Sequence, residues 1–240
     1  MKDVLGTLAF ALYPAFALLI GGAYALVRVP GAGARSAIQH FTAGVIFAAL
    51  ATELLPDLMH RRMPLVTLAG FSLGVLVMLG IKHLAEKAGQ KGISQTKQPT
   101  SLLVTLGVDV VLDGLLIGLG FAAGQKQGLL LTVALSLEVL FLGLSCSTAL
   151  VGAGAGRRRI ITILLILTTL LMIGALAGAV MLSAASPTVI DGVLAFGVAA
   201  LLYLVIEELL VEAHDAPETA LQTSMFFVGF IVLLLIEMMI

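Results

Sequence analysis

The sequence predicts an all-α protein that crosses a membrane eight times. Hydrophobic residues make up 60% of the 240 residues and charged residues only 11%, whereas a soluble domain carries about 25% charged residues. The apolar residues form eight long runs, each close to the roughly 20 residues that a spanning helix needs. None of these runs alternates as the strands of a β-barrel do. We therefore expect a single transmembrane domain over residues 1–240.

The eight helices are expected in the order of the apolar runs. Their approximate ranges are 4–27, 37–59, 64–84, 101–123, 128–151, 160–184, 188–211 and 219–240. Proline and glycine mark most of the turns between them, at 30–33, 63–64, 124–128, 152–159, 186–187 and 215–217. The longest polar stretch, from Lys87 to Thr100, falls between the third and fourth helices. We expect it to form a mobile cytoplasmic loop.

The distribution of Lys and Arg predicts the orientation, because cytoplasmic loops carry an excess of both. With the N-terminus outside, nine of the 13 Lys and Arg residues fall on the inner side. These nine are Arg28, Arg35, Lys82, Lys87, Lys91, Lys97, Arg157, Arg158 and Arg159. An even number of helices then puts both termini outside the cell membrane. Lys2 and Asp3 lead directly into the first apolar run without a cleavage site, so we expect that helix to be retained.

Three acidic residues lie where a membrane helix would normally be apolar. Asp109 and Asp113 fall in the fourth helix and Glu138 in the fifth. An acid near the bilayer centre costs about 2.5–3.5 kcal/mol, so it usually faces a cavity or a partner and marks a functional site. At 1.5 Å per residue, Asp113 lies about 18 Å from the inner surface and Glu138 about 15 Å from the outer one. Both therefore lie near the midplane, and Asp109 projects from the same helix face as Asp113.

These three carboxylates lie at a depth that water does not reach without a cavity. They suit a path for a cation or for protons.

Further polar residues extend from the centre toward both membrane surfaces. The predicted pathway residues are Glu53, Asp57 and His60 in helix two, and Glu207, Glu208, Glu212 and His214 in helix seven. Acceptors at every depth favour a path for a cation or for protons. The acids at the helix ends fit solvated interfacial side chains equally well. Pro56 in helix two should leave a backbone carbonyl without its partner one turn earlier.

Helices two and seven also share a short sequence pattern. Residues 53–57 read Glu-Leu-Leu-Pro-Asp and residues 208–212 read Glu-Leu-Leu-Val-Glu, on helices that run in opposite directions. Inverted repeats are a common way of building transporters. The pattern is typical of an inverted repeat that relates helices two and seven.

The chain resembles the ZIP (Zrt/Irt-like) family of divalent metal transporters over nearly its whole length. Residues 48–57 are similar to the family's helix-two stretch that ends in Leu-Pro-Glu, and residues 202–210 are similar to its Tyr-Val-x-x-Glu-Glu-Leu pattern in helix seven. The resemblance implies eight helices, both termini outside and a polar cytoplasmic loop after helix three. It also implies an inverted repeat of helices one to three and six to eight around helices four and five. It also implies transport of a divalent metal of the zinc, manganese or iron class.

The resemblance also indicates how this site departs from the family pattern. Helix four of the family carries His-Asn-x-Pro-Glu-Gly, and alignment on Asp113 and Gly114 puts Asp109 at the histidine position. In helix five, Glu138 takes the first ligand position and Leu142 stands where a second glutamate is found. Carboxylates thus replace a site of mixed nitrogen and oxygen ligands, and the residues present imply one metal ion.

The resemblance therefore implies that the three acids are the metal ligands. Our hypothesis is that Asp109, Asp113 and Glu138 bind one divalent cation, with Ser136, Ser145 or water completing its shell. Carboxylate oxygens favour manganese, magnesium or calcium, whereas imidazole favours zinc, copper and iron. Zinc and iron also fit, because carboxylates bind them as well.

Other functions also fit the sequence. The same acids suit a proton-coupled transporter or exchanger of another small cation, or a ZIP-like relic that does not transport. We do not expect an enzyme, because the sequence has no Ser-His-Asp set and no H-E-x-x-H motif. The expected partners are the transported ion and membrane lipid, with no cofactor and no nucleic acid. The helices rich in Gly and Ala are compatible with a homodimer.

Overall fold

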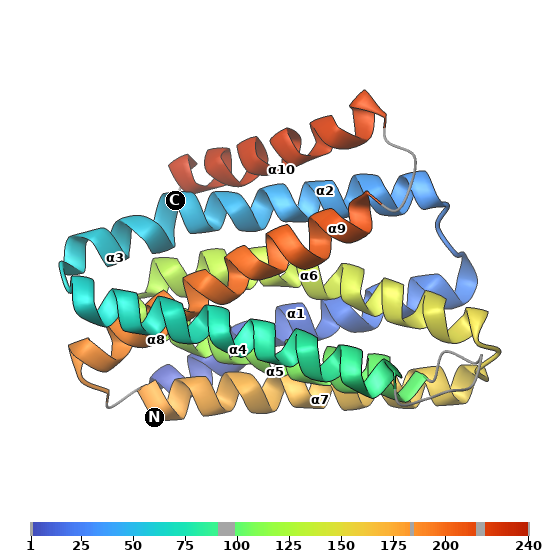
Figure 1. Ribbon diagram of the computed structural model, residues 1–240, viewed down its shortest axis with the longest axis horizontal. Coiled ribbons are helices and arrows are strands. Elements are labelled where there is room, and N and C mark those ends of the chain that lie inside the picture. The colour runs from blue at the N-terminus through green and yellow to red at the C-terminus, as the bar shows by residue number, and fades with distance from the viewer. Residues whose placement is uncertain (1, 91–98, 183–184, 215–218, 240) are drawn as a thin grey trace.

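The computed structural model describes residues 2–90, 99–182, 185–214 and 219–239, and the elements in these ranges are helices (Figure 1). In chain order they are α1 (Lys2–Val27), α2 (Ala32–Ala49), η1 (Leu50–Leu54), α3 (Leu55–Arg61), α4 (Pro64–Gln90), α5 (Pro99–Ala123), α6 (Gln125–Gly152), α7 (Arg157–Leu182), α8 (Pro187–Tyr203), η2 (Leu204–Leu209), α9 (Leu210–Ala213) and α10 (Ala220–Met239). The segments η1 and η2 are π-helical and continue α2 into α3 and α8 into α9. Eight helices in the described ranges are long and apolar enough to cross a membrane, which confirms the predicted eight-span, all-α fold.

Several helices extend beyond the apolar runs. α2 begins at Ala32, five residues before the predicted start, and α4 continues to Gln90, where the sequence predicts a loop from Lys87. Lys, Ala and Gln have high helix propensities, so a helix need not end where its apolar residues do. α5 begins at Pro99, because proline is favoured in a first helical turn. The predicted loop is therefore too long, and its middle, residues 91–98, lies outside the described residues.

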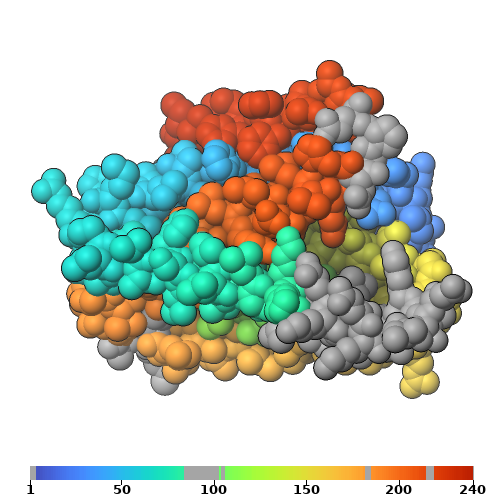
Figure 2. Space-filling model, in the orientation of Figure 1, coloured from blue at the N-terminus to red at the C-terminus, as the bar shows by residue number. Residues whose placement is uncertain are grey.

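The spans run side by side along the long axis of the molecule, and both ends of the chain lie at the same end of the bundle (Figure 1). We call this the terminal end; α4, α6 and α8 begin there, and α3 and α10 finish there. α5, α7 and α10 begin at the opposite end. On the face drawn in Figure 2, α4 and the α8–α9 span cover the middle of the molecule, and α10 forms its upper edge.

Four helix pairs pack so closely that their contacts require glycine. α1 packs on α6, α5 on α7, α2 on α10 and α4 on α8. A Cβ atom on Gly21 would collide with the carbonyl oxygen of Leu140, and one on Gly44 with that of Phe226. Similar collisions with backbone atoms would occur at Gly70, Gly114, Gly143, Gly174 and Gly229. Small residues of this kind let helices approach within a membrane, where close packing drives association.

The helix pairing supports the predicted inverted repeat. The spans in chain order are α1, α2–α3, α4, α5, α6, α7, α8–α9 and α10. An inverted repeat pairs α1 with α7, α2–α3 with α8–α9, α4 with α10, and α5 with α6. When each span is replaced by its counterpart, the contact of α1 with α6 becomes that of α7 with α5. The contact of α2 with α10 likewise becomes that of α8 with α4. The second and seventh spans, which are counterparts in this repeat, both contain a π-helical segment.

The two π-helical segments carry acidic residues. η1 contains Glu53, and η2 contains Glu207 and Glu208. Pro56 lies just after η1 and has no N–H to donate, so a carbonyl one turn earlier loses its usual partner, as the sequence predicts. Val211 occupies the matching position after η2, so proline is not the cause of the second segment. π-Helical turns within longer helices are frequent at functional sites.

Candidate metal site

The structure brings together the three acids from the middle of the membrane spans. Asp109 and Asp113 lie on α5 and Glu138 lies on α6, and these two helices pack against each other. One carboxylate oxygen from each residue lies within 4.8 Å of those of the other two. We call Asp109, Asp113 and Glu138 the central acids.

The central acids are buried, and several of their oxygens have no partner. Asp113 is 1% exposed and Glu138 is 2% exposed, whereas Asp109 is half-buried. Among the described residues, Oδ2 of Asp113 and both carboxylate oxygens of Glu138 accept no hydrogen bond. A buried charge without a partner is strongly destabilising, and neighbouring carboxylates repel each other. A divalent cation between them would satisfy these oxygens, so the residues present fit such an ion.

The donor set consists of oxygen atoms. Carboxylates bind hard divalent cations well and also bind zinc. Ser136, a predicted further ligand, donates its hydroxyl to the carbonyl of Thr132 with an Oγ–O distance of 2.5 Å. Its hydroxyl hydrogen is thus committed to its own helix, while its oxygen can still accept or coordinate. Coordination by Ser136, Ser145 or water stays a prediction.

Glu208 connects the central acids electrostatically to the opposite end of the bundle. From η2, its carboxylate interacts with the charges of all three central acids. The ammonium of Lys82 on α4 offsets part of the Glu208 charge. Lys82 also forms an ion pair with Glu207, with a distance of 2.7 Å between Nζ and Oε2. Two predicted pathway residues, Glu207 and Glu208, therefore lie beside the Lys82 ammonium.

Glu212 and His214 lie farther along at the opposite end, against α2. The amide of Gln39 donates a hydrogen bond of 2.6 Å to Oε2 of Glu212. The ring of His214 lies 5.5 Å from that of His40, measured between centroids. His40 is buried, and its Nδ1 lies 2.9 Å from the carbonyl oxygen of Ser36. These α2 residues were not among the predicted pathway residues, because the sequence does not show that α2 and α9 meet.

At the terminal end, Glu53 lies in an ion-pair cluster. Its Oε2 is 3.4 Å from Nζ of Lys126 at the start of α6. The same Nζ lies 3.3 Å from Oε1 of Glu237, near the end of α10. We call Glu53, Lys126 and Glu237 the terminal cluster. Lys126 and Glu237 were not among the predicted pathway residues.

The other two predicted pathway residues of helix two have local partners. Arg61 forms an ion pair with Asp57, with 3.1 Å between Nη2 and Oδ2. Nδ1 of His60 lies 2.7 Å from the carbonyl oxygen of Pro56, on the same helix, and the His60 side chain is exposed. Both arrangements are those of side chains at the end of a helix.

Asp191 is a buried acid that the sequence reasoning also missed. It is 0% exposed, and its Oδ2 accepts a hydrogen bond of 3.2 Å from Thr67, which joins α8 to α4. Asp191 lies three residues after the start of the predicted run 188–211, and Glu237 lies three residues before the end of the run 219–240. The criterion of depth near the bilayer centre therefore selects neither acid.

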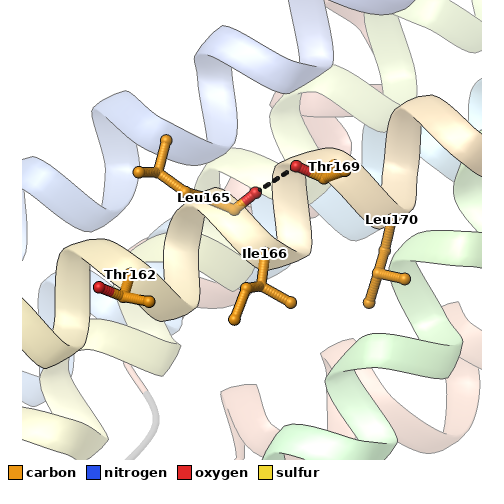
Figure 3. A pocket seen from close by; sticks show the side chains of 5 residues that line it. All are labelled: Thr162, Leu165, Ile166, Thr169 and Leu170. Carbon is orange, nitrogen blue, oxygen red and sulfur yellow. Dashed lines mark hydrogen bonds between the residues drawn. The ribbon is translucent and has the colours of Figure 1, made fainter.

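A shallow groove on the exposed side of α7 contains none of this chemistry (Figure 3). Its lining residues are Thr162, Leu165, Ile166, Thr169 and Leu170. The Thr169 hydroxyl donates a 2.8 Å hydrogen bond to the Leu165 carbonyl, so this polar group is satisfied within the helix. None of the lining residues is ionisable. The groove therefore suits lipid contact and does not resemble an ion path.

Comparison with known proteins gives two consistent matches. The family model described as ZIP Zinc transporter matches residues 84–237, which include the central acids and η2. The chain is also 28% identical over 226 residues to Zinc transporter GufA of Myxococcus xanthus; the match covers 93% of this chain and 80% of that protein. The family match spans more than half of a chain with eight membrane-spanning helices, and the protein is therefore a member of the ZIP family.

Proposed function

We propose that the chain carries a divalent cation across the membrane through a site formed by the central acids. Divalent metal transport follows from membership of the ZIP family. The observation that supports this route is the convergence of three carboxylates within 4.8 Å, with buried oxygens that lack hydrogen bonds among the described residues. Transporters commonly hold their cargo near the bilayer midplane, between repeats, as these helices would.

We propose zinc as the first ion to test. The relative is named a zinc transporter, and so is the family. Manganese and iron(II) should compete with zinc more strongly here than at a histidine site, because the three central donors are carboxylate oxygens. One ion per site fits the three carboxylates.

We also propose a direction for the path. The excess of Lys and Arg at the opposite end predicts that this end faces the cytoplasm and that both termini are outside. On this orientation, an entering ion passes Glu53, binds to the central acids and leaves by way of Glu208, Glu207 and Glu212. His60, Asp57 and His214 lie at the two ends of this path. The exposed apolar side chains of α4, α7 and α10 contact lipid, and a homodimer stays a prediction.

Zinc uptake by proteoliposomes tests the proposal. Purified wild-type chain should carry zinc to a fluorescent chelator inside the vesicles, and Asp113→Asn should reduce the initial rate at least about tenfold, because binding in the transport step loses a charged ligand. Asp191→Asn is the matched control, because it changes another buried acid away from the site and can still accept the Thr67 hydrogen bond. Equal uptake by Asp113→Asn and wild type would refute the route. Movement of protons without zinc, followed with a pH dye, would instead support an exchanger of another cation.

A further inference from the structure

The terminal cluster holds a cation that belongs to the chain itself. Nζ of Lys126 lies 3.4 Å from Oε2 of Glu53 and 3.3 Å from Oε1 of Glu237, and it donates a hydrogen bond to Glu237. The three residues come from α6, η1 and α10, so this contact joins spans that are far apart in sequence. Glu53 and Glu237 also lie close enough to repel each other. Lys126 therefore occupies the space between two acids that need a cation.

Burial differs sharply between the ammonium and its two partners. The side chain of Glu53 is 8% exposed and that of Glu237 is 12% exposed, whereas that of Lys126 is 45% exposed. Lysine carries its charge on a flexible stem and can reach water while the stem lies along the protein. The carboxylates are thus mostly enclosed by protein, and the ammonium reaches them from the exposed side. Lys126 can leave without exposing a buried cation or moving a helix.

The charges of the cluster favour a divalent competitor. Two ionised carboxylates and one ammonium leave a net charge of −1, which a divalent cation in place of the ammonium would bring to zero. Sodium or potassium would only exchange one unit charge for another, and would lose the charge-assisted hydrogen bond that Lys126 donates to Glu237. The charge balance therefore favours a doubly charged competitor over a singly charged one.

The ion pair at the opposite end of the bundle differs from the terminal cluster in its number of acids. There Lys82 forms an ion pair with Glu207, at 2.7 Å, and the two side chains are 47% and 42% exposed. The inverted repeat relates this pair of spans, α4 and α8–η2, to the pair α10 and α2–η1. In the pair α4 and α8–η2, the acid Glu207 has a lysine, Lys82, as its partner on the neighbouring span. In the pair α10 and α2–η1, the neighbour of Glu53 is another acid, Glu237, and the lysine comes from α6. The terminal cluster therefore has one acid more than its lysine neutralises.

We propose that Lys126 is a specificity-determining residue: its ammonium occupies an outer cation site made by Glu53 and Glu237, and a divalent metal ion displaces it on the way to the central acids. This proposal rests on the proposed function for the direction of transport. The site itself does not depend on the central acids. Glu138 lies twelve residues after Lys126 on α6, about 18 Å along the helix, so the two sites hold separate ions.

Metal binding by the full chain tests the proposal with the central site neutralised. In an Asp113→Asn, Glu138→Gln background, zinc titration by calorimetry should show only weak binding while Lys126 is present. Adding Lys126→Gln should tighten zinc binding about tenfold, because zinc no longer competes with the ammonium. Lys126→Arg should leave the weak binding unchanged, and adding Glu53→Gln to the Lys126→Gln protein should abolish the gain. A purely structural lysine would give no such gain.

Two results of this titration would overturn the proposal. One is equal zinc affinity with and without Lys126→Gln, and the other is a gain that survives Glu53→Gln. Neither result bears on transport through the central acids, because those are already neutralised. Conversely, loss of zinc uptake in the Asp113→Asn protein says nothing about the terminal cluster.

A labelling experiment on the native chain covers the case in which Lys126→Gln does not fold. Zinc should increase the rate at which an amine-acylating reagent modifies Lys126, measured by mass spectrometry, because displacement frees the ammonium from its carboxylates. The reference is the Glu53→Gln protein, which lacks one acid of the outer site, and there zinc should change the Lys126 rate by less than about twofold. Sodium and potassium at the same ionic strength should leave the Lys126 rate unchanged in both proteins. An unchanged or slower Lys126 reaction with zinc would contradict the proposal.

Discussion

Acids from neighbouring spans meet both in the terminal cluster and in the central site, but only the terminal cluster contains a lysine. Glu53 and Glu237 share the Lys126 ammonium, whereas the described residues give the central acids no hydrogen bond to Oδ2 of Asp113 or to either oxygen of Glu138. The central site is also the more deeply buried of the two. The carboxylates of the central site therefore have fewer partners than those of the terminal cluster, although they are less accessible to water.

This difference indicates two kinds of cation site in one helix bundle, one that contains a lysine and one that does not. In the terminal cluster, the Lys126 ammonium offsets the repulsion between two acids until a divalent cation displaces it. At the centre, the carboxylates have no built-in substitute, so the transported ion itself has to supply the positive charge. The first arrangement favours selection, and the second favours binding of the cargo at the midplane.

The largest effect is expected when the centre is given a lysine of its own. Glu138→Lys would place an ammonium beside Asp109 and Asp113 and make the site resemble the terminal cluster. Zinc uptake by proteoliposomes should fall about a hundredfold or more, because the site loses a ligand and gains a competing charge. Glu138→Gln, which removes the charge without adding one, is the control and should retain more residual uptake. A zinc uptake rate for Glu138→Lys close to that of wild type would contradict the claim that the central site needs the transported ion as its cation.

Metal removal should lower the stability of the chain through the central site. At a zinc concentration about 100 times the dissociation constant, binding adds about 2.7 kcal/mol of stability. The temperature of thermal unfolding in detergent should therefore rise when zinc is added and fall back when a chelator removes it. Asp113→Asn should show little of this shift, whereas Asp191→Asn should show all of it. A full zinc shift in the Asp113→Asn protein would place the ion elsewhere.

The two lysines should differ in how much they stabilise the fold. Lys82→Gln should cost less than about 0.5 kcal/mol, because both partners of its ion pair are well exposed to solvent. Lys126→Gln should cost about 1 kcal/mol, since it leaves two mostly buried acids facing each other. Denaturant unfolding of the two variants measures the difference. Equal costs would mean that the repulsion between Glu53 and Glu237 is relieved in another way.

The smallest effect is expected at Asp191. Asp191→Asn should keep the hydrogen bond from Thr67 that joins α4 and α8, and zinc uptake should stay within about twofold of the wild-type rate. Thr67→Val would remove that bond and should lower stability by about 1 kcal/mol without changing the zinc affinity. A loss of zinc affinity in either variant would make Asp191 part of the ion path.

The central acids could be predicted because their signals are local. Asp109 and Asp113 are one helical turn apart, and a count of residues from each membrane surface puts Glu138 at the depth of Asp113. Pro56 gave a similar local signal for a backbone carbonyl without its usual partner, one turn earlier in the same helix. Each of these inferences needs only the geometry of a single helix and the thickness of a bilayer.

The terminal cluster could not be predicted in this way. Lys126 and Glu237 are 111 residues apart, and their contact depends on how α6, α2 and α10 pack. That packing is set by glycine contacts such as Gly44 against Phe226, and a single sequence does not show which backbone a glycine meets. The same reason applies to Gln39 and Glu212 at the opposite end, where α2 meets α9.

Zinc-anomalous diffraction from crystals of the full chain would test the central claim most directly. We predict one strong anomalous peak between the carboxylates of Asp109, Asp113 and Glu138, and its loss in the Asp113→Asn protein. A strong peak beside His40 and His214 at the opposite end, with none among the central acids, would contradict the account.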